Sequence, residues 1–361
     1  MTLLTGNPLK EVLKYGQGVW YDGLVSVEEF RRLIEEDGIR GATTNPTIFE
    51  KAISGGQYDA EFQSLTGVQN EELVYQAIAV KAVQEVADVF RPVYEETNGR
   101  DGFVSMEVSP FLAHDTEGTV REARELFGRV GRKNLMIKVP ATKEGIPAVE
   151  TLIAEGVSVN VTLIFSVERY REVMEAYLKG SERRLAKGLP LHLTASVASF
   201  FVSRVDTAVD KRLVEKAGHQ RLAGKAAIAN SKAAYEEFEK TFFSARFMKL
   251  KEKGAQVQRP LWASTGTKDP RYRDVLYVEA LIGPDTVNTI PPATLAAFRD
   301  HGTAAARLKE NRVEARRVLE ELKGVGVDLS EITRDLEKAG VEAFSESYRK
   351  ILQVIRGKIE D

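Results

Sequence analysis

The sequence has no cysteine among its 361 residues and no excess of either charge, with 51 Lys and Arg against 53 Asp and Glu. The missing cysteine excludes disulfides, thiolate zinc sites, iron–sulfur clusters and cysteine nucleophiles. The formal net charge of -2 argues against nucleic-acid binders and polybasic membrane-surface proteins, because both depend on a large positive field. We therefore expect neither nucleic acid nor a membrane surface as a partner.

Long hydrophobic runs and targeting signals are also missing. The longest stretch without Asp, Glu, Lys or Arg runs from Gly188 to Ser203. It contains several polar residues and is shorter than the roughly 18 apolar residues of a membrane-spanning helix. The first ten residues lack the basic start and apolar core of a secretory signal. With 43% hydrophobic residues, the chain has enough apolar surface for a sizeable core. These features predict a soluble, cytoplasmic protein.

The motifs of several common enzyme classes do not occur. The sequence contains no GxGxxG, GxxxxGK[ST], HExxH or GxSxG, so standard nucleotide-binding, zinc-protease and hydrolase interpretations lose their support. We predict no metal site, because the four histidines share no ligand spacing. They are His114, His192, His219 and His301.

What the sequence does contain is a regular alternation of short apolar segments with longer stretches of helical periodicity. Repeated strand-then-helix units imply a parallel sheet. Eight such units without a glycine-rich dinucleotide turn favour a closed (β/α)8 TIM barrel over an open doubly wound sheet. The predicted strands are 18–22, 39–43, 102–107, 135–139, 157–163, 191–196, 260–264 and 286–290.

A barrel of this kind needs about 250 residues, which leaves roughly a hundred for additional helices. We expect them in a helical insertion at about 204–253 and in a C-terminal helical extension at about 307–361. The extension alternates Lys and Arg with Glu around Leu, Val and Ile, which predicts a helical wrap with a solvated face. No linker rich in Pro, Gly or Ser divides the chain, so residues 1–361 are predicted to form one domain.

Polar residues stand at the ends of several predicted strands. Asp22, Glu107 and Lys138 each close an apolar run, and Asn45 follows another. Catalytic groups of barrels come from the C-terminal ends of several strands, because the interior is packed and the top face is open. Each residue alone has a structural explanation, such as a helix cap for Asn45 or an ion pair for Glu107. The four together favour an active site.

A lysine within an apolar strand suggests a particular chemistry. An ammonium ion cannot attack a carbonyl, and burial among apolar neighbours favours the neutral amine, so Lys138 is a candidate for Schiff-base formation. Its acid/base partner would be Asp22 or Glu107, the latter acting through a water held by Thr162. Asn160 lies two residues before Thr162, so both side chains of this strand can point inward.

Six sequence blocks carry a more specific signal. They are Asp-Gly at 22–23, Ala-Thr-Thr-Asn-Pro-Thr at 42–47, Ser-Met-Glu-Val at 105–108, Ile-Lys-Val-Pro-Ala-Thr at 137–142, Asn-Val-Thr-Leu-Ile-Phe-Ser at 160–166 and Ser-Phe-Phe-Val-Ser-Arg at 199–204. Together they resemble the transaldolases. The matches occur in the family's order and extend from about residue 20 to about residue 290.

The resemblance implies a class I aldolase-type barrel that acts in the pentose phosphate pathway without a metal or organic cofactor. Lys138 would form an imine with C2 of a ketose phosphate, and Asp22 would deprotonate the C4 hydroxyl. Asn45 and Asn160 would bind the hydroxyls of the retained dihydroxyacetone unit. The expected sugar phosphates are fructose 6-phosphate or sedoheptulose 7-phosphate as donor and erythrose 4-phosphate or glyceraldehyde 3-phosphate as acceptor.

By the same resemblance, Ser199 and Arg204 would hold the distal phosphate, a role that suits the fork of the guanidinium group. The sequence departs from the best-known members at two places. Phe200 stands where proline is usual, and the block after the seventh strand lacks the arginine found two residues past Ser264. Lys268 is predicted to supply that charge. The longer chain indicates a larger, divergent subfamily.

Two other functions fit parts of the pattern. A fructose 6-phosphate aldolase would use the same lysine but release dihydroxyacetone by protonating the enamine, although such aldolases are much shorter. A catalytically silent barrel could bind sugar phosphates or partners through its charged C-terminal helices. Family analogy leaves a monomer or a homodimer open.

Overall fold

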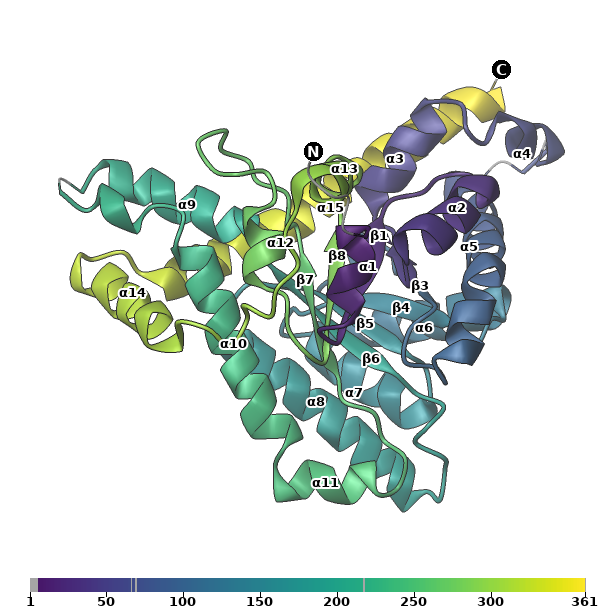
Figure 1. Ribbon diagram of the computed structural model, residues 1–361. Coiled ribbons are helices and arrows are strands. Elements are labelled where there is room, and N and C mark those ends of the chain that lie inside the picture. The colour runs from purple at the N-terminus through teal and green to yellow at the C-terminus, as the bar shows by residue number, and fades with distance from the viewer. Residues whose placement is uncertain (1–5, 66, 69, 217, 361) are drawn as a thin grey trace.

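The computed structural model describes residues 6–360 except 66, 69 and 217. Eight parallel strands are hydrogen-bonded in chain order, and the eighth pairs with the first, so the sheet closes into a barrel. The predicted (β/α)8 barrel is therefore confirmed (Figure 1). The strands are β1 (Gln17–Asp22), β2 (Gly41–Thr43), β3 (Phe103–Glu107), β4 (Leu135–Pro140), β5 (Val159–Ile164), β6 (Ser196–Phe201), β7 (Arg259–Ala263) and β8 (Thr286–Ile290).

Helices surround the barrel and also lie over one of its ends. They are α1 (Pro8–Leu13), α2 (Val27–Asp37), α3 (Pro46–Ser54), α4 (Asp59–Ser64), α5 (Glu71–Glu96), α6 (Thr116–Val130), α7 (Gly145–Glu155), α8 (Val167–Ala186), α9 (Ser203–Val214), α10 (Ala226–Phe242), α11 (Ala245–Lys251), α12 (Leu276–Ala280), α13 (Pro292–His301), α14 (Arg312–Gly324) and α15 (Leu329–Glu360), with the 3-10 helices η1 (Pro110–Leu112) and η2 (Gln220–Leu222). The predicted insertion at 204–253 contains α9, η2, α10 and α11. Within the described residues, no helix is long and apolar enough to cross a membrane.

The sixth predicted strand was wrong in position, while the other seven overlap observed strands. The sequence predicted a strand at 191–196, but β6 begins at Ser196. Leu191 and Leu193 alternate with polar residues as in a strand, yet Leu193 is 52% exposed and the backbone N–H of Thr194 bonds back to the Leu191 carbonyl in a turn. Alternation alone cannot report burial. The correction places Ser199 inside β6.

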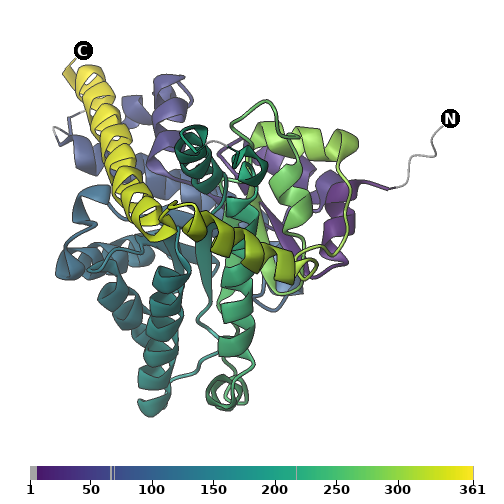
Figure 2. The same cartoon turned by 90° about the vertical axis from the view of Figure 1, so that its left-hand side faces the viewer.

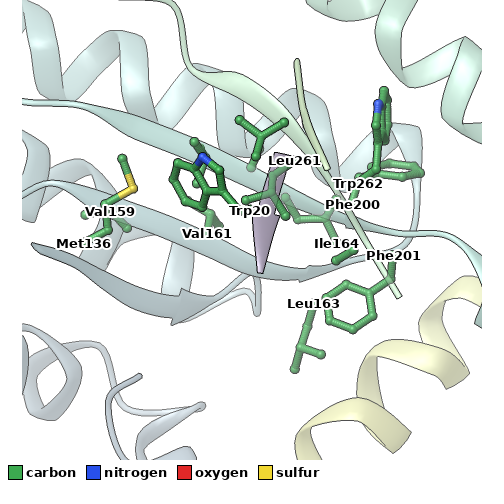
Figure 3. Close-up of a cluster of buried hydrophobic side chains, with 14 of the residues drawn as sticks. Trp20, Met136, Val159, Val161, Leu163, Ile164, Phe200, Phe201, Leu261 and Trp262 are labelled. Atoms are coloured by element: carbon green, nitrogen blue, oxygen red, sulfur yellow. The ribbon is translucent and has the colours of Figure 1, made fainter. Parts of the chain in front are cut away.

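Successive side chains of a strand point to opposite faces, so neighbouring residues of β6 face the surrounding helices and the barrel interior in turn. Figure 3 shows the buried cluster that includes Phe200 and Trp262. Phe200 packs edge-on against Trp262 and against Tyr170 of α8, so it faces the surrounding helices. Its neighbour Ser199 points the other way and donates a hydrogen bond to Asn160 on β5. On β6, Phe200 thus packs the outside of the barrel wall, and Ser199 faces the interior.

The C-terminal extension lies across the end of the barrel at which the strands finish. α15 packs on α3, α5, α9 and β5, and Figures 1 and 2 show it as the long yellow helix that leaves α14 and runs along α3. Glu337 near its start pairs with Arg169 of α8 at 3.2 Å, and Ser347 hydrogen-bonds Thr47 of α3 at 2.9 Å. The predicted helical extension is confirmed, and it covers the mouth of the barrel.

Candidate functional site

A cavity of about 590 Å³ opens at the C-terminal ends of the strands. Most of the residues predicted from sequence line it. Those residues are Asp22, Asn45, Lys138, Thr162, Ser199, Arg204, Ser264 and Lys268. The other two predicted residues lie just behind the wall, where Glu107 contacts Lys138 and Asn160 contacts Ser199.

Lys138 projects from β4 and is only 5% exposed. Its Nζ donates a hydrogen bond to the Thr44 carbonyl at 2.9 Å and lies 3.4 Å from Oε2 of Glu107. The pairing of β3 with β4 sets Glu107 opposite Lys138 in register, which fixes this acid beside the amine. Burial raises the pKa of Glu107, and the charge of Lys138 acts in the opposite direction. The amine and the acid therefore share one buried pocket.

Asp22 stands at the end of β1 and is held by a threonine of the neighbouring strand. Thr43 of β2 donates to Oδ1 of Asp22 at 2.8 Å, and its hydroxyl also bonds Thr289 of β8 at 2.6 Å. Burial raises the pKa of Asp22, opposed chiefly by the charge of Lys138 and by the Thr43 hydrogen bond. A positioned carboxylate with increased basicity is suited to general-base chemistry.

Two buried oxygens beside the lysine lack a hydrogen-bond partner among the described residues. They are Oε2 of Glu107, whose contact with Lys138 is an ion pair at 3.4 Å, and Oγ1 of Thr162. Buried polar atoms in proteins almost always have a partner, supplied by protein, water or ligand. These two oxygens are therefore candidates to hold a water or a substrate hydroxyl.

The two predicted asparagines differ in their surroundings. The side chain of Asn160 is fully buried, with Oδ1 accepting from Ser199 at 2.6 Å and Nδ2 donating to Ser105 at 3.0 Å. It supports Ser199 rather than lining the cavity. Asn45 does line the cavity, and its Oδ1 also caps α3 by accepting from the Ile48 N–H at 3.0 Å. The cap explanation for Asn45 thus holds alongside a possible contact with substrate.

Cations gather on the wall of the cavity. Arg204 is the second residue of α9, and its guanidinium lies 5.3 Å from the centre of the Phe201 ring. Burial lowers the pKa of Arg204, opposed by the charge of Asp22. Neither Arg204 nor Lys268 forms an ion pair with a carboxylate in the described part of the chain. Two such cations beside a helix N-terminus make a ready anion site.

The cavity wall also contains residues that sequence reasoning missed, among them Lys51 of α3 and Phe344 of α15. The Phe344 ring centre lies 5.8 Å from Nζ of Lys138. Apolar periodicity in the C-terminal extension did indicate a buried helix face, but it did not indicate which part of the barrel that face would cover. Lys51 follows Asn45 by under two helical turns, a spacing that could have placed it over the same strand end.

Comparisons with known proteins point to one family. The model of the Transaldolase/Fructose-6-phosphate aldolase family matches residues 19–355. A transaldolase of Saccharopolyspora erythraea is 46% identical, with 99% of each chain covered. A transaldolase of Thermobifida fusca is 49% identical over 96% of this chain and 97% of its own, and transaldolase 2 of Nostoc punctiforme is 44% identical over 99% of each. The similarity therefore extends over nearly the whole chain.

Proposed function

Because the chain belongs to the transaldolase/fructose-6-phosphate aldolase family, we propose that it transfers dihydroxyacetone between sugar phosphates through a Schiff base on Lys138. Its sequence is 46% and 49% identical to two transaldolases over almost their entire length, so the protein is an enzyme of the transaldolase type. The proposed donors are fructose 6-phosphate and sedoheptulose 7-phosphate, and the acceptors are erythrose 4-phosphate and glyceraldehyde 3-phosphate. The proposed setting is the pentose phosphate pathway in the cytoplasm.

The observation that carries the proposal is the position of one amine. Lys138 is 5% exposed, and its Nζ lies 3.4 Å from Oε2 of the buried Glu107. Lys138 and Asp22 line the same cavity. Attack of this amine on C2 of the ketose gives a carbinolamine, and loss of water from it gives the imine. Glu107 and Thr162 would hold the water that carries protons in this step, which would satisfy their two unpartnered oxygens.

Cleavage follows from the place of Asp22. The carboxylate of Asp22 takes the proton of the C4 hydroxyl, and the C3–C4 bond breaks. The electron pair of this bond moves into the protonated imine to give an enamine. An aldose phosphate leaves, and the dihydroxyacetone unit stays on Lys138. Addition of the enamine to the aldehyde of an incoming aldose phosphate reverses these steps, and hydrolysis of the new imine frees the product. We propose that Asn45 contacts the hydroxyls of the retained unit and that Asn160 orients Ser199.

The cationic wall would hold the phosphate. Arg204 can donate two parallel hydrogen bonds, Lys268 adds a point charge, and the hydroxyl of Ser264 can donate to a remaining oxygen. Ser199 lies on the same wall with its hydroxyl proton directed to Asn160, so it would have to turn that proton to reach a phosphate. Ser264 is already oriented by its hydrogen bond with Ser203 at 3.0 Å. Both cations lack carboxylate partners among the residues described, so binding a phosphate breaks no existing ion pair.

Removing a phosphate contact should weaken binding more than chemistry. In Lys268→Ala, we expect kcat/KM for fructose 6-phosphate to fall about 10- to 100-fold, since a hydrogen bond to a charged group contributes roughly 1.5–3 kcal/mol. The change should appear mostly in KM. Steady-state kinetics with fructose 6-phosphate and with unphosphorylated fructose would check this, because the variant should match the wild type on fructose. The matched control is Lys253→Ala, an exposed lysine outside the cavity. An equal loss on both sugars would contradict a phosphate role.

The test of the proposed function is chemical trapping. Borohydride reduction of the wild-type enzyme with fructose 6-phosphate should leave a three-carbon adduct, because the aldose phosphate departs before reduction. Peptide mass mapping should find the adduct on the segment from Leu135 to Ala141, which contains Lys138 as its one lysine. Labelling of another lysine, or no labelling, would refute the proposed mechanism.

A further inference from the structure

The C-terminal helix brings an aromatic ring to the reactive amine. Phe344 of α15 is 5% exposed, lines the cavity and has its ring centre 5.8 Å from Nζ of Lys138. Within the described residues, the amine also contacts the Thr44 carbonyl and Glu107. Phe344 is thus an apolar side chain that lies over the amine.

The backbone is arranged so that α15 can come this close. β5 carries one extra residue relative to β6 between Val161 and Ile164, and Leu163 in this bulge adopts a left-handed φ of 60°. Figure 3 shows Leu163 on the side of the buried cluster that faces α15. A Cβ on Gly340 of α15 would lie 2.9 Å from Cδ2 of Leu163, so a larger residue here would require the end of the Leu163 side chain to shift. Phe344 is four residues later and therefore lies on the same face of the helix.

Further contacts fix the position of α15 on the barrel. The ring of Tyr348 packs edge-on against Tyr75 and Phe111, with centroid separations of 5.1 and 5.2 Å. Ser347 bonds Thr47, which follows closely after Asn45 at the end of β2. Residues on both sides of α15 thus fix it against the barrel. Phe344 is held over the lysine by packing rather than by a contact of its own with a polar group.

The enamine proposed above has two possible electrophiles, and these give different products. Attack on an aldehyde gives transfer. Alternatively, a proton from water forms a C–H bond at the nucleophilic carbon and regenerates the iminium. Water then adds at the iminium carbon, the lysine amine leaves, and dihydroxyacetone is released. An apolar ring over the nitrogen excludes water from that side, and its face favours the positive iminium over a neutral carbinolamine.

We propose that Phe344 determines the fate of the enamine, favouring transfer to an aldehyde over protonation by water. This inference rests on the Schiff-base function proposed for Lys138. It assigns the C-terminal extension a part in reaction specificity, in addition to its packing on the barrel.

The experiment compares Phe344→Ala with Phe344→Leu. Release of free dihydroxyacetone from fructose 6-phosphate is measured without acceptor, and transfer is measured with erythrose 4-phosphate. In Phe344→Ala, the ratio of release to transfer should rise roughly fivefold or more, because water reaches the enamine. Phe344→Leu keeps an apolar cover and should stay close to the wild-type ratio. An unchanged ratio in the alanine variant would overturn the proposal.

Ile351→Ala is the matched control for loosening of the helix. Ile351 is fully buried on α15 and does not line the cavity, so its truncation should reduce stability without changing the ratio. An equal rise in this variant would assign the effect to helix packing and overturn the role of Phe344. Borohydride trapping separates this proposal from the mechanism. If wild-type Lys138 is labelled and the ratio in Phe344→Ala does not change, only the inference about Phe344 fails. If wild-type Lys138 is not labelled, the Schiff-base function itself fails.

Discussion

Replacing Lys138 with methionine should lower kcat/KM for transfer by roughly 10⁴-fold or more, because it removes the amine proposed to form the imine. Methionine has a similar length and suits the apolar surroundings of β4. The substitution leaves the buried Glu107 without the amine that lies 3.4 Å from it. Since burial already raises the pKa of Glu107, that carboxyl can take up a proton, which limits the structural cost. Coupled assays of transfer, together with thermal unfolding of the variant, would measure both effects.

The control for Lys138 is a lysine just before the same strand. Lys133 is exposed and precedes β4, so Lys133→Met should leave transfer and borohydride labelling at wild-type levels. The methionine variant at 138 should give no sugar adduct after reduction. Retention of more than a small fraction of the activity, or an adduct on another lysine, would mean that a different nucleophile carries the reaction.

Replacing Asp22 with asparagine should stop the reaction after the imine has formed. We expect kcat to fall by about 10²- to 10⁴-fold, the range typical for loss of a general acid or base. Because C3–C4 cleavage is blocked and imine formation is not, borohydride should now trap the intact six-carbon sugar phosphate on Lys138. Mass mapping distinguishes this adduct from the three-carbon adduct of the wild type. A three-carbon adduct formed at the wild-type rate would exclude Asp22 as the base.

The pH profile gives a second measure of Asp22. The base acts as a carboxylate, and burial raises its pKa, so activity should be lost on acidification at a higher pH than for an ordinary aspartate. Thr43 donates a hydrogen bond that favours the carboxylate, so Thr43→Val should move the acidic limb further toward neutral pH. A profile unaffected by Thr43→Val would contradict the assignment of that limb to Asp22.

Much of the site could be predicted because parallel strands bring their C-terminal ends together. The ends of β3 and β4 adjoin in any barrel with this strand order, and register then sets Glu107 opposite Lys138. The position of β6 could not be predicted, because alternating Leu191 and Leu193 look the same whether a chain turns or extends. In the structure, Phe200 and Phe201 of β6 are buried, whereas Leu193 is exposed in a turn.

Long-range packing accounts for what sequence reasoning missed. Phe344 belongs to a helix whose apolar face could have packed on any surface of the barrel. The helix packs on β5 where Gly340 lies close to Leu163 in the bulge, a contact between residues far apart in the sequence that no local pattern indicates. Similarly, spacing did not indicate that Asn160 is hydrogen-bonded to Ser105 and Ser199, and its contact with substrate stays a prediction, since Nδ2 retains a second hydrogen. Hydrogen-bond partners across a barrel interior depend on register, which spacing along one strand does not give.

The position of α15 in the chain has a consequence for biosynthesis. All eight strands leave the ribosome before α15 does, so a nascent chain can close its barrel while the mouth is still uncovered. During that interval the amine of Lys138 would face the metabolites of the cell without its aromatic cover. By the role proposed for Phe344, docking of α15 on the completed barrel would reduce release of dihydroxyacetone and favour its transfer to an aldose phosphate.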